Sequence, residues 1–454
     1  MDVIAAIATA AAPSAIGVLR ISGEGTARVL SALFVPKSGA SAAALPSHHM
    51  VYGTVLDARG NPIDCALAVR FDAGHSYTGE ESAEVHCHGS PVVLSEALSA
   101  AFAAGARQAR AGEFTKRAFL NGKLDLTEAE AVIDLIDAET ANAARNAAAQ
   151  LSGALGREIR AVREALLSVT SRFYAVVDYP DEDIEDLTRE ETERALAFSE
   201  ETLSRLLATA SRGQVLKYGV KTAILGAPNA GKSSLLNRLV GYDRAIVTPV
   251  AGTTRDTVEE KAVVGGVLLR LTDTAGLRDT DDEVEKLGVE RSRRAAEDAD
   301  LLFLLIDASR PLSPGDEEAL SLAQASGKPW ILIYAKSDLP REKNLAAQSF
   351  GASASLFLSS RTGEGYDALE AAVASLFPQG FAGETLLTNP RQTDAAERAL
   401  ARVREALAAL RGGMTPDVVL TEAEAALDVL GELTGETARE AIVSAIFDRF
   451  CVGK

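Results

Sequence analysis

The sequence predicts a mixed protein, with two α/β domains and one helical domain that is built from two separated segments. Short apolar runs between Gly, Pro and Asn turns predict an α/β domain over residues 1–118. Alanine-rich stretches with helical spacing follow, and the same pattern returns later in the chain. Between them, strand and helix patterns alternate as in a parallel sheet. We therefore expect a helical domain over 119–214 and 379–454, interrupted by an inserted α/β domain with a parallel-rich sheet over 215–378.

Length, composition and charge are typical of a folded protein of several domains. The 454 residues suffice for about three domains of ~100–200 residues each. A hydrophobic content of 47% with 24% charged residues is ordinary for a globular protein. The formal net charge of −18 argues against a general nucleic-acid coat. A polynucleotide would have to meet a local basic patch or be held by a partner.

The sequence also indicates where the protein resides. No apolar run approaches the ~18 residues of a membrane span, and the run LLFLLI near the middle has the length of a strand. The N-terminal stretch carries Asp2 where a signal peptide has basic residues, so we interpret it as a first strand. Three cysteines form no disulfide framework. We expect a cytoplasmic protein with no membrane segment.

The expected elements follow in chain order. In the first domain we expect strands at residues 16–23, 51–57 and 65–72. Residues 126–178 combine helical spacing with many alanines and almost no breakers, which predicts one or more long helices. Pro180 and an acid-rich stretch interrupt this pattern before it resumes.

A phosphate-binding loop is predicted at GAPNAGKS, from Gly226 to Ser233, which fits the pattern G-x-x-x-x-G-K-S. It follows the strand pattern KTAILG and opens the helix pattern SSLLNRLVG. Gly226 and Gly231 permit the turn, and backbone N–H groups at the helix N-terminus hold phosphate oxygens. Lys232 supplies charge to the terminal phosphates, and the Ser233 hydroxyl suits Mg²⁺. The alternative, a Gly-rich turn without a ligand, is disfavoured by this strand–loop–helix context.

Motifs further along the chain indicate GTP rather than ATP. LTDTAG ends a strand pattern with Asp273, spaced to reach Mg²⁺ through water, and Gly276, whose N–H can follow the γ-phosphate. AGTTRD supplies Thr254, placed to complete the Mg²⁺ coordination. ILIYAKSD ends with Lys336 and Asp338, and a carboxylate there accepts two hydrogen bonds that guanine offers and adenine does not. LSSRTGEG fits the loop that contacts the guanine carbonyl. Their order predicts a Ras-like P-loop GTPase domain.

The guanine motif departs from its usual form, Asn-Lys-x-Asp, because Ala335 replaces the asparagine. The lost amide mostly braces the phosphate loop, whereas Asp338 selects the base. We therefore expect guanine specificity to be kept and nucleotide retention to be weaker.

The groups that promote hydrolysis differ from those of Ras-like enzymes. The position of the water-orienting glutamine is occupied by Leu277, and the phosphate loop holds no arginine. Glu285 is the candidate that orients the attacking water, the alternative being a solvated acid on a helix face. Asn229 offers an oxygen that, with loop carbonyls, would hold a monovalent cation near the phosphates. Arg255 and Arg278 are alternative charge-neutralising groups.

Beyond the GTPase motifs, the chain resembles the MnmE (TrmE) family of tRNA-modifying GTPases over essentially its whole length. The matching motifs are GVLRISG, YTGE with a following HG, GEFTKRAFLNGKLDLTEAEAVIDLIDA from Gly112, GAPNAGKSSLLN, VAGTTRD, DTAGLRD with EVEKLGVERS, NPRQ and the terminal FCVGK. The stretch from Gly112 and the ending are the most specific, because other GTPases lack them.

This resemblance implies a folate-binding N-terminal domain that dimerises, a helical domain and an inserted G domain. The homodimer would work with the FAD-dependent flavoprotein MnmG (GidA) as a heterotetramer. The pair would add a carboxymethylaminomethyl or aminomethyl group at C5 of the wobble uridine of certain tRNAs. A tetrahydrofolate derivative, 5-formyl- or 5,10-methylene-tetrahydrofolate, would donate the one-carbon unit. GTP hydrolysis would require K⁺, which brings the two G domains together.

The motifs and the resemblance together give the expected site residues. The catalytic residues are Glu285, Lys232 and Cys451. The GTP contacts are Asn229, Ala230, Gly231, Lys232, Ser233, Ser234, Thr248, Pro249, Val250, Ala251, Gly252, Thr253, Thr254, Asp273, Thr274, Ala275, Gly276, Lys336, Asp338, Ser359, Ser360 and Arg361. The Mg²⁺ ligands are Ser233 and Thr254. By resemblance alone, the K⁺ ligands are Asn229, Thr248, Val250 and Thr253. By resemblance, the folate contacts are Arg20, Glu84, Lys123 and Lys454, whose charges suit a ligand with carboxylates and pterin N–H groups.

The ending CVGK suggests a prenylation motif, but lysine is not a usual last residue of that motif. The helical pattern AREAIVSAIFDRF would instead place Cys451 against the folate domain, with Lys454 beside the ligand. The chemical role of Cys451 stays open. The alternative function is a GTP-dependent switch or assembly factor, similar to ribosome-associated GTPases, whose flanking domains only bind partners. The ending and the stretch from Gly112 favour the modification enzyme.

Overall fold

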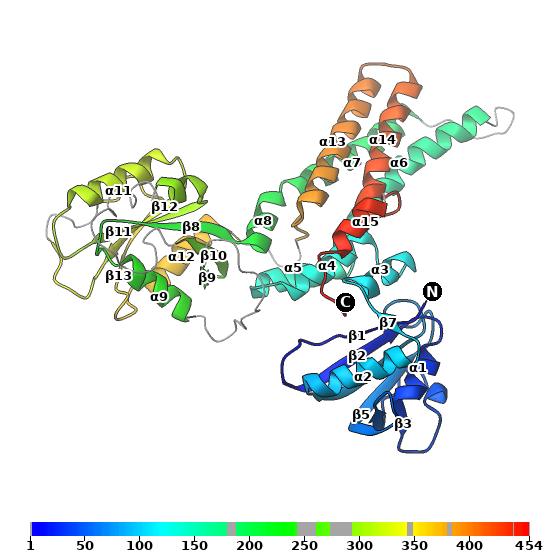
Figure 1. The fold of residues 1–454 in the computed structure, drawn as a ribbon. Coiled ribbons are helices and arrows are strands. Elements are labelled where there is room, and N and C mark those ends of the chain that lie inside the picture. Colours follow the sequence, from blue (N-terminus) through cyan, green and yellow to red (C-terminus); the bar gives the residue numbers. More distant parts are fainter. Residues whose placement is uncertain are drawn as a thin grey trace. The chain divides into compact units, whose positions relative to one another are not determined.

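The chain forms two compact units (Figure 1). The computed structural model describes residues 2–178, 188–242, 260–272, 293–342, 348–378, 384–438 and 440–453. Unit 1 comprises Met1–Ile133, Ala148–Leu203 and Ala395–Lys454, and unit 2 comprises Asp134–Ala147 and Ser204–Asp394. Unit 1 is thus assembled from segments on both sides of unit 2 in the sequence. The finer division into four segments stays a prediction.

The N-terminal part of unit 1 is built on a seven-stranded sheet of order β3-β4-β5-β6-β2-β1-β7. The strands are β1 (Ile4–Ile7), β2 (Ser14–Ser22), β3 (Phe34–Pro36), β4 (Val51–Leu56), β5 (Pro62–Phe71), β6 (Ser82–Gly89) and β7 (Arg107–Gln108). Neighbouring strands are antiparallel except for β1 and β7. The three strands expected from the sequence are confirmed as β2, β4 and β5.

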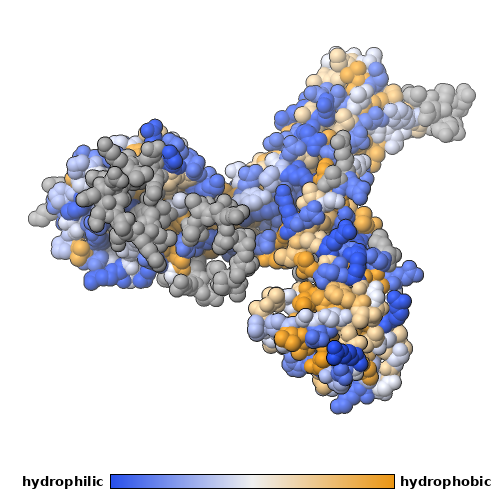
Figure 2. Space-filling view, viewed as in Figure 1, coloured by the Kyte–Doolittle hydropathy of each residue, from blue (hydrophilic) through white to orange (hydrophobic). Residues whose placement is uncertain are grey.

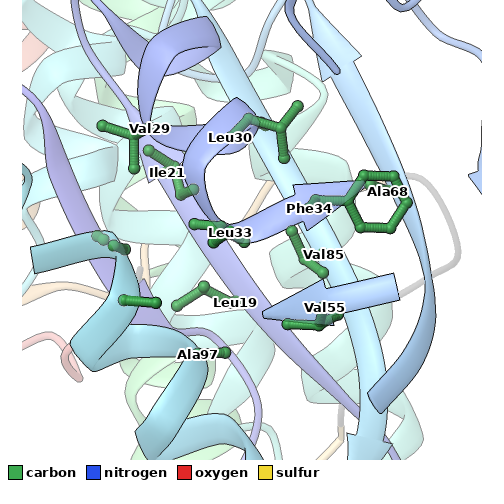
Figure 3. Close-up of a cluster of buried hydrophobic side chains, with 14 of the residues drawn as sticks. Leu19, Ile21, Val29, Leu30, Leu33, Phe34, Val55, Ala68, Val85 and Ala97 are labelled. Atoms are coloured by element: carbon green, nitrogen blue, oxygen red, sulfur yellow. The ribbon is translucent and has the colours of Figure 1, made fainter. Parts of the chain in front are cut away.

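Two helices, α1 (Thr26–Leu33) and α2 (Pro91–Ala103), pack their apolar side chains on one face of this sheet. Figure 3 shows Val29, Leu30 and Leu33 of α1 meeting strand residues such as Leu19 and Val85. Because successive strand side chains point to opposite faces, Leu19 and Ile21 enter this core. Arg20, between them, lies on the other face and pairs in register with Glu84 of β6.

The long helical stretch predicted from Leu126 is three helices: α4 (Leu126–Ile136), α5 (Ala141–Leu151) and α6 (Ala154–Asp178). Thr140 begins α5, since its hydroxyl accepts a hydrogen bond from the Ala143 N–H at 3.1 Å. Gly153, with φ of 78°, separates α5 from α6 in a left-handed conformation that favours glycine. These local signals divide a sequence whose apolar spacing alone is continuous.

Further helices follow along the chain: α7 (Arg189–Leu207), α13 (Pro390–Arg411), α14 (Pro416–Thr434) and α15 (Glu440–Phe447), with most of α7 and α13 and all of α14 and α15 in unit 1. Helices α13 and α14 lie side by side, with Arg398 bonded to Glu432 at 3.0 Å (Figure 1). On the face shown in Figure 2, hydrophilic residues predominate over these two helices. Within the described ranges, no helix has the length and apolarity needed to span a bilayer.

A charged network ties the start of the chain to α3 (Glu113–Leu120). Arg117 is buried and bonds Glu80, Glu113 and Asp2 at 2.8, 3.1 and 2.9 Å. Arg107 adds bonds to Glu113 and Asp2. Although burial alone would raise it, these bonds hold the pKa of Glu113 at about 2, below its ordinary 4.5. The network therefore stabilises the fold only while its carboxyl groups are ionised.

Unit 2 contains a six-stranded sheet of order β13-β12-β11-β8-β10-β9, parallel except for the edge strand β9. The strands are β8 (Val220–Leu225), β9 (Glu260–Val264), β10 (Val267–Thr272), β11 (Leu301–Asp307), β12 (Trp330–Ala335) and β13 (Ala354–Leu358). The helices α8 (Ala210–Tyr218), α9 (Lys232–Tyr242), α11 (Pro314–Ala325) and α12 (Tyr366–Leu376) belong to the same unit. Strands β11 and β12 are buried along their whole length, as expected for a covered parallel sheet. The predicted fold class is confirmed.

Candidate nucleotide and ligand sites

The predicted phosphate loop connects β8 to α9. Gly226, Asn229 and Gly231 have φ of 144°, 60° and 109°, in the left-handed range that lets successive backbone N–H groups turn inward. A Cβ at Gly226 would lie 2.5 Å from the carbonyl oxygen of Leu305, so only glycine fits there. The loop thus has the backbone geometry of an anion-binding turn.

Lys232 folds back across this loop. Its Nζ donates to the carbonyl oxygens of Gly226 at 2.7 Å and Ala227 at 2.9 Å. The helix ladder of α9 starts with the bond from the Leu235 N–H to Gly231, so the first-turn N–H groups lie outside it. Ser233 in this turn is exposed. A lysine ammonium, a hydroxyl and a helix N-terminus therefore meet at one place, which favours phosphate.

A cavity of 310 Å³ adjoins the phosphate loop and brings together residues that are far apart in the sequence. Its lining residues are Gly231, Ser234, Ala335, Lys336, Asp338, Leu339, Ser360 and Arg361. The end of the phosphate loop, the motif after β12 and the loop after β13 therefore line one cavity, and its role as a guanine pocket stays a prediction. The volume is at the lower end of the ~300–1,000 Å³ of small-molecule sites.

Asp338 is held in place by the loop after β13. Its Oδ1 accepts a hydrogen bond from the Ser359 hydroxyl at 2.7 Å, and its Oδ2 pairs with Arg361 Nε at 3.0 Å. The Ser359 bond chiefly, with Arg361, keeps the pKa of Asp338 below its ordinary value. The group is therefore an ionised acceptor at neutral pH, which is what recognition of two guanine N–H groups requires.

Ala335, the unusual residue of the guanine motif, is buried at the end of β12. Its Cβ lies 3.9 Å from the point where a Cβ on Gly231 would stand. Position 335 therefore faces the phosphate loop. An asparagine at this position would reach that loop with its side-chain amide, and Ala335 cannot make this contact.

Many of the predicted nucleotide and metal contacts lie outside the described residues, and their roles stay predictions. They are Thr248, Pro249, Val250, Ala251, Gly252, Thr253, Thr254, Asp273, Thr274, Ala275, Gly276, Glu285 and Lys454. Arg255, Leu277 and Arg278 also fall there.

A second candidate site lies on the open face of the N-terminal sheet. Arg20 donates from Nε to Glu84 Oε1 at 2.9 Å, and the His86 Nε2 lies 3.2 Å from Glu84 Oε2. The His86 bond first, and then Arg20, hold the pKa of Glu84 below its ordinary value. The Arg20 guanidinium is 5.7 Å from the ring centres of Tyr77 and Phe114.

Arg20, Glu84 and Tyr77 border a cavity of 160 Å³. Its lining residues are Arg20, His48, Phe71, His75, Ser76, Tyr77, Thr78, Ser82 and Glu84. A space this small fits one flat ring rather than a drug-sized ligand, which needs ~300 Å³ or more. A pterin ring, with N–H donors for Glu84 and a face for Tyr77, suits this residue set.

The other predicted folate contact and the cysteine lie near the same region. The Lys123 Nζ donates to the carbonyl of Gly74 at 2.9 Å, on the loop that carries Tyr77. Cys451 is exposed, and the carbonyl of Gly453, two residues further along, accepts a bond from Arg20 at 3.3 Å. The described end of the chain is therefore within hydrogen-bond distance of a residue that lines the cavity.

Tyr77, His48 and Phe71 are cavity residues that the sequence does not identify by themselves. Tyr77 belongs to a motif of the resemblance, but nothing local indicates that its ring faces Arg20. His48 has φ of 63° and packs edge-on against Phe71, with ring centres 5.1 Å apart. Such contacts depend on strand pairing between distant segments, which residue spacing does not reveal.

A phosphate loop between a central parallel strand and a helix, next to a cavity with a strand-end carboxylate, defines the class of P-loop GTPases. Two family descriptions match the chain: "MnmE helical domain" over residues 126–451 and "GTP-binding protein TrmE N-terminus" over residues 3–123. A protein named tRNA modification GTPase MnmE from Symbiobacterium thermophilum is 44% identical over all of this chain and 99% of its own length. A protein of the same name from Roseiflexus sp. (strain RS-1) is 42% identical, and the match covers 100% of this chain and 99% of that protein.

The chain belongs to the MnmE family of tRNA modification GTPases. Among solved structures, the G domain of the T. maritima FeoB iron transporter is similar, with 29% identity and a TM-score of 0.24. That match covers 34% of this chain and 97% of the other.

Proposed function

We propose that this chain is the GTP-hydrolysing subunit of an enzyme that modifies the wobble uridine of tRNA. The product would be a carboxymethylaminomethyl or aminomethyl group at uridine C5, with a tetrahydrofolate derivative as one-carbon donor. The supporting observation is that relatives named tRNA modification GTPases match the whole chain, including both candidate sites. Membership of the family implies binding of GTP and Mg²⁺ and action on tRNA.

The nucleotide would lie along the phosphate loop with its base in the 310 Å³ cavity. Lys232 would exchange its two loop carbonyls for phosphate oxygens, and Asp338 would accept from the base. Mg²⁺, held by Ser233 and Thr254, would neutralise charge on the phosphates. The exposed Ser233 hydroxyl in the first turn of α9 fits this role.

K⁺ would bind next to the phosphates, where it would supply the positive charge that other GTPases take from an arginine. Asn229 supports this, since it lies within the phosphate loop and has a left-handed backbone with φ of 60°. Thr248, Val250 and Thr253 would complete the ligand set, and Glu285 would orient the attacking water. Thr254, Asp273 and Gly276 would contact the metal and the γ-phosphate.

Folate would place its ring in the 160 Å³ cavity, with Arg20 and Glu84 as partners. The remainder would extend past Lys123 and Lys454, whose charges suit the folate carboxylates. Bound there, the folate would supply the one-carbon unit. Cys451, two residues before the Gly453 carbonyl that bonds Arg20, stays a candidate catalytic residue whose chemical role is open.

The proposed assembly is a homodimer with the FAD-dependent flavoprotein MnmG (GidA), as a heterotetramer in the cytoplasm. A face for the second copy is the side of the N-terminal sheet opposite α1 and α2, where Val35, Tyr52 and Leu67 are exposed. Tyr52 and Leu67 stand opposite each other in the β4–β5 register. The flavoprotein would hold most of the tRNA, which is compatible with a net charge of −18 on this chain.

The proposed domains are 1–118 for folate binding and dimerisation, 119–214 and 379–454 for the helical domain, and 215–378 for the G domain. The grouping of residues 204–394 into unit 2 supports the inserted G domain.

Phosphate release from GTP by the purified chain tests the nucleotide part. We expect turnover in KCl that falls sharply in NaCl, and a Glu285→Ala variant that binds GTP without turnover. Equal rates in both salts would remove the cation role of Asn229, and turnover by the variant would mean that another group orients the water. The alternative function, a GTP-dependent switch without modification chemistry, predicts turnover and no effect on tRNA nucleosides.

A further inference from the structure

Asp307, the last residue of β11, is a buried carboxylate that the proposed mechanism does not use. Its Oδ1 accepts hydrogen bonds from the Ser309 N–H at 3.0 Å and the Ser309 hydroxyl at 2.6 Å. Its Oδ2 accepts from Lys336 Nζ at 2.7 Å, and the Arg310 Nε lies 3.9 Å away. Burial would raise the pKa of Asp307, but the bonds from Lys336 and Ser309 hold it below its ordinary value. The carboxylate is therefore charged, and only 7% of its side chain is exposed.

Lys336 is fixed at both ends by this arrangement. Its backbone has φ of 60°, a left-handed conformation that non-glycine residues rarely adopt. Its ammonium is bound to Asp307, which belongs to the neighbouring strand β11. Lys336 lines the 310 Å³ cavity, and its methylene stem runs between these two fixed points. A stem held in this way presents an apolar wall, whereas a free lysine would sample many rotamers.

We propose that Asp307 is a positioning residue that holds the Lys336 stem as the wall on which the nucleotide base packs. This inference rests on the proposed binding of guanine nucleotide in that cavity. The chain has a particular need for it, because Ala335 lacks the side chain that would tie this segment to the phosphate loop at Gly231. The bond from Lys336 to Asp307 instead ties this segment to β11, whose parallel pairing with β12 sets Asp307 opposite Ala335.

The proposal differs from a purely structural role for Asp307, in which it only caps the turn at Ser309. A structural role predicts that removing the Asp307 charge lowers the stability of the fold. It also predicts that any effect on nucleotide affinity is the same whether or not Lys336 is present. A positioning role predicts that the effect on affinity passes through the Lys336 side chain. A double-mutant cycle separates the two.

The test is titration of a fluorescent GDP analogue (mant-GDP) with the purified full chain in Mg²⁺ and KCl. The variants are Asp307→Asn, which keeps the volume, Lys336→Met, which keeps the apolar stem length, and the double variant. We expect each single variant to bind about tenfold more weakly and the double variant to bind no more weakly than Lys336→Met. The control is Asp300→Asn, just before the other end of β11, where Asp300 accepts a hydrogen bond from the Lys221 N–H at 3.1 Å. This variant should bind as the wild type does.

Competition with unlabelled nucleotides gives a second readout. An apolar wall contacts any purine, so Asp307→Asn should weaken GDP and inosine diphosphate by the same factor. The positioning role would be overturned if Asp307→Asn bound mant-GDP as tightly as the wild type. It would also be overturned if the loss of affinity in the double variant were the product of the losses in the two single variants. Unequal losses for the two nucleotides would also overturn it. If the wild type itself bound no mant-GDP, the proposed nucleotide site would fail, and this inference with it.

Discussion

Replacement of Asp338 by asparagine should change which base the cavity accepts. In the structure, the carboxylate is oriented by Ser359 at 2.7 Å and is an acceptor at both oxygens. Guanine offers it two N–H donors. An asparagine keeps one acceptor and places an NH₂ group where the second was, so one bond is lost and a donor faces a donor.

The expected size follows from these two bonds. Loss of one hydrogen bond to a charged group costs about 1.5–3 kcal/mol, and the guanine donor that is left without an acceptor costs about 1–3 kcal/mol more. At about 1.4 kcal/mol per factor of ten, GDP affinity should fall roughly 10²–10⁴-fold. Folding should change little, because the asparagine oxygen still accepts from Ser359 and the Arg361 partner is 78% exposed.

The Asp338→Asn variant should bind xanthosine diphosphate more tightly than the wild type does. Xanthine carries a carbonyl where guanine carries its amino group, so the asparagine NH₂ can donate to it while the asparagine oxygen accepts from the ring N–H. Competition of GDP and xanthosine diphosphate against mant-GDP measures both changes in one experiment. Unchanged GDP affinity, or a loss of GDP affinity without any gain for xanthosine diphosphate, would refute the assignment of Asp338 to base recognition.

Three further predictions concern other parts of the chain. Because the pKa of Glu113 is about 2 in the folded protein and 4.5 ordinarily, its ionic bonds contribute stability above pH ~4.5 that is lost as the pH falls toward 2, roughly 3 kcal/mol in all. Hydrogen exchange of α3 should therefore be faster in Glu113→Gln at pH 7 and equal to the wild type near pH 2; equal rates at pH 7 would contradict this. Ala335→Asn should tighten mant-GDP binding by up to about tenfold, the worth of one hydrogen bond to the phosphate loop, whereas Ala335→Leu should not, and equal affinities would remove the bracing role. Gly453→Ala should displace the tail, since φ is 101° and a Cβ would lie 2.5 Å from a backbone oxygen of β1; we expect lost tRNA modification with GTP turnover kept, and intact modification would argue against a role for the tail.

The parts of the molecule that were predictable are those specified by neighbouring residues. The phosphate loop follows from the spacing of Gly226, Gly231 and Lys232, because the turn and the helix start are local events. The meeting of Asp338 with Arg361 follows from the βα rhythm, since parallel strands end at one edge of a sheet.

Other features depend on contacts that the sequence does not encode locally. The bond between Asp307 and Lys336 joins the end of β11 to the residue after β12, and a helix separates the two strands in the sequence. The approach of Gly453 to Arg20 joins opposite ends of the chain. Residue spacing predicts neither pairing, because each depends on how distant segments pack within one unit. Thr140 and Gly153 are residue types that often begin or end helices. The apolar spacing continues across both positions, however, so spacing alone predicts no division of the long helical stretch there.

Mass spectrometry of tRNA nucleosides tests the central claim most directly. The comparison uses a strain that lacks this gene and carries either the wild-type chain or Lys232→Ala. We expect the wobble-uridine modification to be absent in the deletion strain, restored by the wild-type chain and not restored by Lys232→Ala, which loses its contact with the terminal phosphates. Unchanged wobble-uridine modification in the deletion strain would contradict the account and favour a GTP-dependent switch without modification chemistry.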